Sequence, residues 1–225
     1  MTLQIDIISD VMCPWCVIGY SALQQALESF PQTPHQIRWH PFELNPDMPP
    51  EGQNLRQHLA EKYGSTDEQS RENRERITAM GAELGFTFNF RDDMRMVNSF
   101  NAHQLLSWAA ELAAQPGYAN SLQTDLQLAL FNGHFRDGRD VSQTEVLVAI
   151  AAEAGLSAER AAEVLQQQQY ASAVRAEQQQ WQQMGIQSVP AVILQNKYLI
   201  SGGQPVPVFV QAIQQCLDEQ AASAG

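Results

Sequence analysis

The spacing of apolar and polar positions divides the chain into three parts. In the first and last parts, short apolar runs predict strands and a 3.6-residue periodicity predicts helices. The predicted elements there are a strand at 3–9, a helix at 14–30, a strand at 36–44, strands at 191–194 and 198–200 joined as a hairpin, and a helix from Pro205 onward. The resulting order is β-α-β, a long helical block, and then β-β-α.

The helical block follows a linker at 46–52 that is rich in proline and glycine. Its helix-start signals are Asn54 as a cap and two capping boxes, at 65–68 and 142–145. The predicted helices are 54–63, 65–85, 98–114, 119–131, one from 142 and one at 157–184, with a turn at 132–140 and the glutamines of 166–169 on a solvated helix face. We therefore expect one domain formed by residues 1–45 and 185–225, and an inserted helical domain at 46–184 whose last helix is free to pack on the first domain.

Charge and apolar content exclude several classes of partner. The 225 residues include 13 Lys and Arg against 25 Asp and Glu, a formal charge of −12, so we expect neither nucleic acid nor an anionic membrane to bind. The first ten residues contain no basic segment or cleavage site, and no apolar run approaches the roughly 18 residues of a membrane span. We expect a cytoplasmic protein, in which two nearby cysteines are catalytic or metal-binding rather than a structural bridge.

The chemistry that the sequence offers is concentrated in Cys13-Pro14-Trp15-Cys16, between the first strand and the first helix. Two cysteines in this spacing lie one helical turn apart, so their sulfurs can meet. At a helix start, unpaired N–H groups and the helix dipole stabilise the thiolate of the first cysteine. Pro14 suits the first helical turn, because its missing N–H would have no partner there. Cys13 is therefore the candidate nucleophile and Cys16 the resolving thiol.

Two other readings of the cysteine pair remain open. A zinc site needs two further ligands, and the sequence offers Cys216 and scattered histidines without a second Cys-x-x-Cys or a His-x₃₋₅-His spacing, so we expect no metal. The pair would also be inert if both cysteines were simply core residues, as free cysteines often are. The position of the two cysteines directly after a strand, at a helix start, favours a chemically reactive pair over both alternatives.

The element order, with the cysteine pair at the first strand-to-helix turn and Val189-Pro190 before the third strand, resembles the thioredoxin superfamily with a helical insertion. Residues 10–16 and 185–190 carry this resemblance, and residues 41–46, 98–105 and 130–141 are similar to a DsbA-like branch called FrnE-like, related to the 2-hydroxychromene-2-carboxylate isomerases. The resemblance implies an α/β thioredoxin-like fold with a large all-helical insertion.

The resemblance also implies a site and an activity. Pro190 would follow a cis peptide bond and face the cysteine pair, although an X-Pro bond considered alone is usually trans. Substrate would then lie against Pro14, Trp15, Val189 and Pro190, with Trp15 serving either as a platform or as packing. The implied activity is disulfide exchange: the Cys13 thiolate forms a mixed disulfide with a polypeptide or small molecule, and Cys16 resolves it.

The rival interpretation is a glutathione-dependent isomerase or kappa-type glutathione transferase on the same architecture. In those enzymes position 13 is usually serine, so the two cysteines here favour disulfide exchange, with no tightly bound cofactor and glutathione as a candidate co-substrate. Among the remaining residues, His40 and His103 are either structural or close to the thiols. Asn98 is expected to cap a helix and Cys216 to be inert core. The insertion could act as a lid or as the surface of a homodimer.

Overall fold

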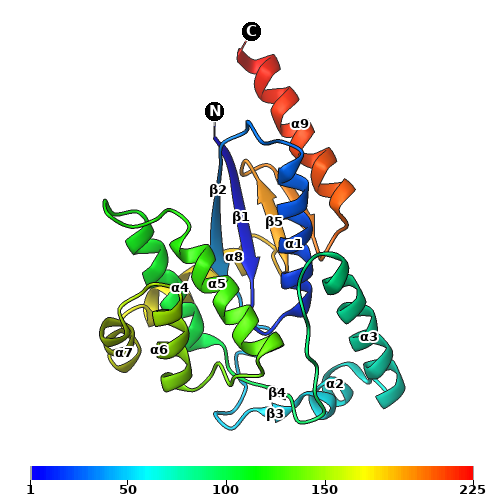
Figure 1. The fold of residues 1–225 in the computed structure, drawn as a ribbon, viewed down its shortest axis with the longest axis vertical. Helices are drawn as coiled ribbons and strands as arrows, with labels where there is room; N and C mark the ends of the chain where they lie inside the picture. Colours follow the sequence, from blue (N-terminus) through cyan, green and yellow to red (C-terminus); the bar gives the residue numbers. More distant parts are fainter. Residues whose placement is uncertain (1, 225) are drawn as a thin grey trace.

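The computed structural model of the protein describes residues 2–224, without the side chains of residues 223 and 224 (Figure 1). The elements run in the order β1 Leu3–Ser9, α1 Pro14–Glu28, β2 His35–Pro41, β3 Gln53–Asn54, α2 Leu55–Tyr63, α3 Asp67–Glu83, β4 Arg95–Met96, α4 Phe100–Ala113, α5 Leu122–Phe131, the π-helical turn η1 Asn132–Arg136, α6 Thr144–Glu153, α7 Ala158–Gln166, α8 Ala171–Gln183, β5 Ala191–Leu194, β6 Tyr198–Ser201 and α9 Val206–Ala224. Within these residues no helix is both long and apolar enough to cross a membrane.

The main sheet has the strand order β2-β1-β5-β6. Strand β1 pairs in parallel with β2 and antiparallel with β5, so Ile7 lies opposite both Trp39 and Val192. The crossover from β1 to β2 is helix α1, and the long connection from β2 to β5 contains all the helices from α2 to α8. This topology confirms the predicted β-α-β, helical block, β-β-α order.

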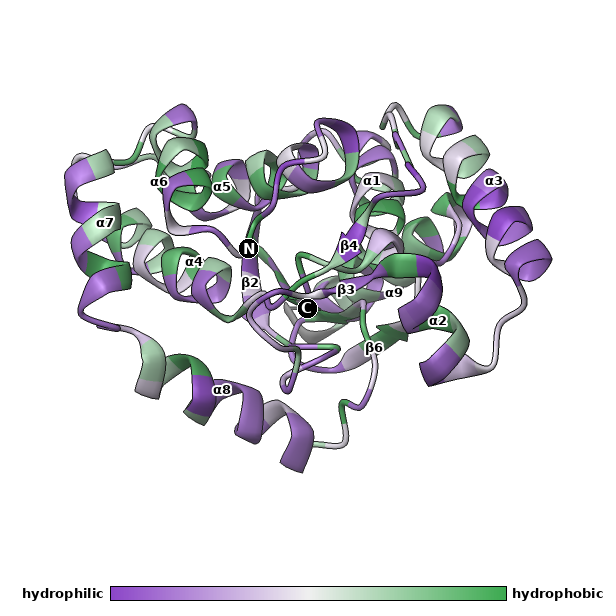
Figure 2. Ribbon diagram, turned by 90° about the horizontal axis from the view of Figure 1, so that it is seen from below, coloured by the Kyte–Doolittle hydropathy of each residue, from purple (hydrophilic) through white to green (hydrophobic). Residues whose placement is uncertain are grey.

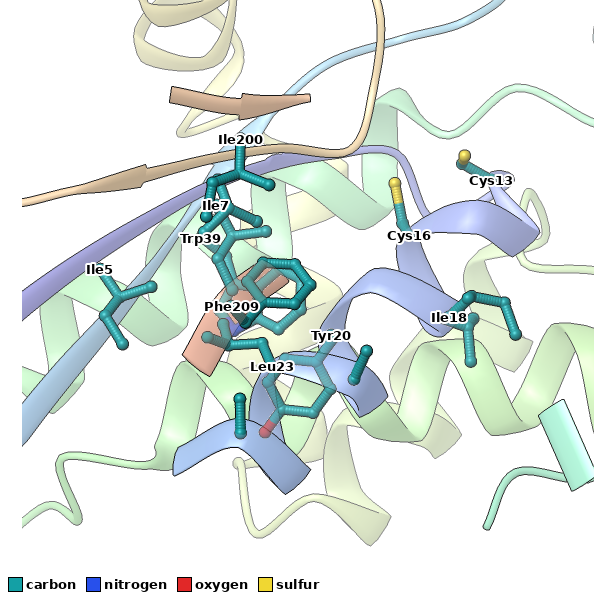
Figure 3. Packing of buried hydrophobic residues seen from close by; sticks show 14 of the residues in the cluster. Ile5, Ile7, Cys13, Cys16, Ile18, Tyr20, Leu23, Trp39, Ile200 and Phe209 are labelled. Carbon is teal, nitrogen blue, oxygen red and sulfur yellow. The ribbon is translucent and has the colours of Figure 1, made fainter. Parts of the chain in front are cut away.

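Strand β1 sends alternate side chains to the two faces of the sheet, as the strand period requires. Ile5 and Ile7 join a core with Leu23 of α1 and Phe209 of α9 (Figure 3). On the opposite face, Ile8 packs in a smaller cluster to which Trp181 of α8 contributes. The start of α1, which follows β1 directly, is therefore fixed by burial on both faces of the central strand.

The outer edge of β2 is covered by a side chain of the insertion. The Gln123 amide of α5 accepts a hydrogen bond from the Trp39 N–H at 3.0 Å and donates one to the Trp39 carbonyl at 2.8 Å. The indole of Trp39 also donates to Thr124 at 3.0 Å. These bonds satisfy strand groups that an edge strand would otherwise leave unpaired. The division into domains at 45/46 and 184/185 stays a proposal, because Phe131 of α5 shares the main core with Trp39.

Several predicted boundaries in the helical block are wrong, for local reasons. The helix expected at 157–184 is two helices, α7 and α8, separated by a turn in which Gln168 has φ +51°. The turn is held by the Gln168 side chain, which donates to the Leu165 carbonyl at 2.7 Å and accepts from Gln104 at 3.0 Å. Gln166 thus ends α7, and Gln167 to Gln169 form this turn rather than a continuous helix face. Strand β2 ends at Pro41, before the predicted position 44.

The helix caps were predicted with mixed success. Asn54 caps α2 by accepting from the N–H groups of two following residues. The first capping box exists, one residue later than predicted, with Thr66 as the cap. The second is absent, since the hydroxyl of Ser142 donates to Asp140 and leaves α6 without a side-chain cap. The predicted turn at 132–140 begins as a π-helical turn that continues α5, and the short β3–β4 sheet was not predicted.

Candidate active site

The cysteine pair stands at the junction of β1 and α1. Cys13 is the N-cap residue of α1, with extended backbone angles of φ −99° and ψ 109°, and Pro14 occupies the first helical turn. The N–H of Cys16 donates to the carbonyl of Cys13 at 3.1 Å, which closes the first turn. Both thiols are free, and Figure 3 shows them projecting to the same side of the helix start. The predicted placement of the motif at a helix N-terminus is confirmed.

The two cysteines differ in access to the surface. Cys13 is 3% exposed and borders a cavity of about 920 Å³, whereas Cys16 is 0% exposed and lies one turn deeper. Burial raises the pKa of the Cys16 thiol well above its usual value, and the adjacent Cys13 raises it further; the Ser9 hydroxyl and the backbone at Asp10 lower it by less. Cys16 is therefore a protonated, enclosed thiol, and Cys13 is the sulfur that a ligand in the cavity would meet.

The segment before β5 completes the site on the other side of Cys13. The Val189–Pro190 peptide bond is cis, as predicted. The Cys13 thiol donates to the Val189 carbonyl with a sulfur–oxygen distance of 3.7 Å. Val189 borders the cavity, while Pro190 is buried behind it, with its Cγ 3.1 Å from the point that a Cβ on Gly19 would occupy. The structure thus brings Val189 to the thiol and packs Pro190 against α1.

Trp15, in the first turn of α1, lies against α3 of the helical block. It is half-buried, borders the same cavity, and has the guanidinium carbon of Arg76 of α3 5.1 Å from its ring centre. Its other neighbour is Gly203, where an added Cβ would come within 3.2 Å of the indole. Trp15 therefore packs against its neighbours and also borders the cavity, and its role as a substrate platform stays a prediction.

A buried carboxylate supports the loop that leads into Cys13. Asp10 accepts hydrogen bonds from the N–H groups of Met12 at 3.0 Å and Leu44 at 2.6 Å, and it lies 3.7 Å from the Nε2 of buried His103. Burial raises the pKa of Asp10, but His103 and the two N–H groups lower it more, so its pKa lies below the usual value. Asp10 is therefore a charged group that holds the loop before Cys13 to the segment that follows β2. Sequence reasoning missed this role, although Asp10 lies only three residues before the motif.

The other candidates from the sequence lie away from the thiols. His40 contacts Glu177 of α8 at 2.5 Å and Asp6 of β1 at 2.8 Å. The Asn98 side chain accepts from the Phe100 N–H at 2.9 Å, but the N-cap residue of α4 is Ser99, which makes no side-chain cap bond. The predicted cap is therefore wrong by one residue. Cys216 belongs to the main core. Within the described residues, His, Cys, Asp and Glu side chains form no cluster of three that could hold a metal ion.

The cavity itself lies between Cys13 and the first two helices of the insertion. Its near wall contains Met12, Cys13, Pro14, Trp15 and Val189, and its far wall is formed by one face each of α2 and α3. The volume is within the range of roughly 300–1,000 Å³ that is typical of small-ligand sites. The sequence identified Cys13, Pro14, Trp15 and Val189 of the near wall but no residue of the far wall, because α2 and α3 are rich in charged residues, which are typical of a solvated helix face.

Comparisons with known proteins agree with this architecture. The model of the family described as DSBA-like thioredoxin domain matches residues 4–214. The uncharacterized protein YwbO of Bacillus subtilis (strain 168) is 24% identical over 221 residues, covering 98% of each chain. The crystal structure of the probable DsbA oxidoreductase SCO1869 from Streptomyces coelicolor is 33% identical, with a TM-score of 0.87 over 96% of this chain and 91% of its own.

A more distant structure shares the fold alone. The cytosolic disulfide reductase DsbM from Pseudomonas aeruginosa, in its structure with GSH, is 18% identical, with a TM-score of 0.63 over 97% of this chain and 100% of its own. Together, the match over most of the chain and the similarity to SCO1869 confirm the α/β thioredoxin-like fold with a helical insertion between its strands. The chain therefore belongs to the family of DSBA-like thioredoxin domains.

Proposed function

We propose that the protein is a thiol-disulfide oxidoreductase in which Cys13 is the nucleophile and Cys16 the resolving thiol. The observation that carries this proposal is the placement of the Cys13 sulfur. Cys13 is the N-cap residue of α1, and its sulfur borders a ligand-sized cavity and lies 3.7 Å from the carbonyl oxygen of Val189. A thiol in this position meets a disulfide that enters the cavity, and a second thiol lies directly beneath it.

The reaction proceeds in two exchanges. Cys13 loses its proton to solvent in the cavity, and its thiolate attacks one sulfur of a substrate disulfide. The substrate S–S bond breaks, a Cys13–substrate disulfide forms, and the other half leaves as a thiolate that takes up a proton. Cys16 then loses its proton and attacks the Cys13 sulfur, which releases the second substrate thiol and forms the Cys13–Cys16 disulfide. Two electrons pass from the protein dithiol to the substrate, and the reverse sequence oxidises a substrate dithiol.

The cavity favours small disulfides or short extended segments as substrates. Pro14, Trp15 and Val189 border it beside Cys13, so they are the proposed substrate contacts, with Pro190 positioning Val189 from behind. DsbM was crystallised with GSH, which supports glutathione as a co-substrate here, without a tightly bound cofactor. The FrnE-like branch, a cytoplasmic location and a homodimer stay predictions from the sequence.

The rival function, a glutathione-dependent isomerase or transferase, draws on the same cavity. In such an enzyme the reacting sulfur belongs to bound glutathione, and the protein needs no resolving thiol. Cys16, fully buried and adjacent to Cys13, has a role only in disulfide exchange. We therefore favour the oxidoreductase, and the two functions give opposite results when Cys13 is replaced.

The test is oxidation of the reduced protein by 2-hydroxyethyl disulfide, followed by mass spectrometry. We expect the wild type to release both substrate thiols and lose two hydrogens. Cys16→Ala should release one thiol and retain the other half as a stable adduct on Cys13, and Cys13→Ser should release none. Cys216→Ala, which removes a thiol in the core, is the matched control and should behave as wild type. Release of thiol by Cys13→Ser would contradict the assignment of the nucleophile.

A further inference from the structure

The far wall of the cavity is an unusual surface for two helices that are mostly polar. In Figure 2 most of α3 is coloured hydrophilic, yet one of its faces turns inward to the cavity. Ser70, Arg74 and Ile77 recur at intervals of four and three, which is the spacing of a single helix face. His58 and Lys62 of α2 border the same cavity at the same kind of spacing. His58 and Ser70 on this wall are buried and Arg74 is half-buried, whereas Lys62 borders the cavity from an exposed position.

Two hydrogen-bond donors on the α3 face are buried without a partner. The Ser70 side chain is 5% exposed, and its hydroxyl has no hydrogen-bond partner among residues 2–224. One helical turn later, the Nε of Arg74 is also buried and unpartnered in that same set. A buried donor without an acceptor costs about 1–3 kcal/mol, and these two atoms on the cavity wall are available to a ligand that supplies the acceptor.

The positive charge of Arg74 is also weakly neutralised by the protein. Its nearest carboxylate is that of Asp92, at 3.5 Å from Nη1, and the Asp92 side chain is 79% exposed. Lys62 adds a second positive charge to the wall, where its ammonium donates to the Leu44 carbonyl and the Asn45 side chain. The one acidic side chain on the border, Glu43, is paired through Oε2 with Arg175, while its Oε1 is buried without a partner among the described residues. The cavity is thus locally positive in a chain whose formal charge is −12.

A third unpartnered atom has the opposite polarity. The Gln53 amide nitrogen donates to Glu61 at 2.6 Å, which orients the Gln53 oxygen toward the Nδ1 of His58 at 2.8 Å. The His58 Nδ1 must then be the donor, and Nε2 carries the lone pair. Burial and the charge of Lys62 lower the pKa of His58 more than the charge of Glu61 raises it, which favours the neutral ring. Its Nε2 is buried without a partner in the described chain and would accept an N–H from a ligand.

We propose that the α2–α3 wall is a recognition subsite for the carboxylate of a short, peptide-like thiol or disulfide. The Arg74 guanidinium and the Ser70 hydroxyl bind the carboxylate, and His58 accepts an amide N–H, while the ligand sulfur meets Cys13. This inference rests on the proposed function and adds the class of substrate to it. Neutral disulfides fit the near wall but leave the donors of the far wall unpaired, so they are poorer substrates.

The experiment measures single-turnover oxidation of the reduced protein by two disulfides. Oxidised glutathione carries carboxylates and amide N–H groups, and 2-hydroxyethyl disulfide carries neither. We expect Arg74→Gln to slow oxidation by glutathione disulfide about tenfold, equivalent to about 1.4 kcal/mol, and Ser70→Ala to slow it less. Neither change should alter the rate with 2-hydroxyethyl disulfide. Arg71→Gln removes the same charge from the exposed side of α3 and is the matched control, with no change expected for either substrate.

A second measurement changes the ligand instead of the protein. The wild type should react about tenfold more slowly with glutathione disulfide whose carboxylates are esterified. This comparison uses the wild-type protein alone, so it does not depend on whether a variant folds. Equal rates for the acid and the ester, or equal losses in Arg74→Gln and Arg71→Gln, would overturn the subsite. Failure of the wild type to react with either disulfide would instead contradict the proposed function, so the two failures are distinguishable.

Discussion

The thiol of Cys13 donates a hydrogen bond to the main-chain carbonyl of Val189, although 176 residues separate them in the chain. The contact joins the two ends of the fold, because Cys13 follows β1 and Val189 precedes β5. These strands are paired in the sheet, with Ile8 opposite Ala191. The distance between the sulfur and the carbonyl is therefore set by strand pairing rather than by a mobile loop.

Gly19→Ala tests whether this placement matters for the chemistry. A Cβ at Gly19 would lie 3.1 Å from the Cγ of Pro190, so the proline and the Val189 carbonyl next to it must shift by a few tenths of an ångström. Alanine also favours the helix by up to about 1 kcal/mol, which offsets part of the strain. We expect the rate of disulfide exchange to fall severalfold, while the free energy of unfolding changes by less than about 1 kcal/mol.

The measurement pairs single-turnover rates with urea unfolding. Ser21→Ala, two residues along α1 and half-buried, is the control and should keep the wild-type rate. An unchanged rate in Gly19→Ala would mean that the position of Val189 is not critical for the reaction.

Alkylation separates the two thiols by their surroundings. Because burial is the largest cause of the raised pKa of Cys16, we expect iodoacetamide at pH 8 to modify Cys13 and to leave Cys16 unmodified. The same protection should persist in Cys13→Ser, since removing the neighbouring sulfur leaves the burial intact. Peptide mass spectrometry of the folded and the urea-unfolded protein measures both sites. Rapid modification of Cys16 in folded Cys13→Ser would show that Cys13, rather than burial, protects it.

The near wall of the site could be predicted from the sequence because its signals are local. The apolar run before Cys13, the proline at position 14 and the spacing of the cysteines together specify a strand, a helix start and a thiol pair. The position of Val189 at the site came instead from the family resemblance. Periodicity alone gives no information on which distant segment pairs with β1.

The far wall could not be predicted, because its residues have an ordinary surface composition. Ser70 and Arg74 occur in a helix with many charged residues. Such a composition is typical of a helix face that lies in solvent. What turns one side of that helix inward is the tertiary contact of α3 with α1, together with the packing of Ile77 and Phe88 in the main core. The break between α7 and α8 was missed for a similar reason, since the Gln168 turn depends on Gln104 of another helix.

Gly81→Ala tests how the far wall is positioned. An added Cβ would lie 2.5 Å from the Phe88 ring and 2.9 Å from the Phe86 carbonyl oxygen, so α3 must move relative to the link that follows it. Phe88 cannot easily yield, because its ring is buried and stacked on Phe90. Overpacking of this kind costs about 1–3 kcal/mol.

We expect Gly81→Ala to lower the free energy of unfolding by that amount and to slow oxidation by glutathione disulfide. Urea denaturation and single-turnover rates measure the two effects. Glu83→Ala, exposed in the same turn, should change neither. A Gly81→Ala protein as stable as wild type would show that the Phe88 contact is loose.

His134 gives the protein a pH dependence of known sign. The pKa of His134 is lowered to about 4. Burial is the cause, and it outweighs the backbone hydrogen bond at Arg139 and the charges of Asp10 and Asp140, which raise the pKa. Between pH 4 and the unfolded value of about 6.5, the unfolded chain therefore binds a proton that the folded chain does not. This contribution to stability is complete above pH 6.5 and is lost as the pH falls toward 4, by up to about 1.4 kcal/mol per pH unit.

His134→Gln removes this pH-dependent contribution. As the pH falls from 6.5 toward 4, the wild type should therefore lose more unfolding free energy than the variant. Urea unfolding at a series of pH values measures the difference, in which the titrations common to both proteins cancel. His35→Gln, at an exposed position, should show no such shift, and a pH-independent difference for His134→Gln would mean that His134 is protonated equally in the folded and unfolded chains.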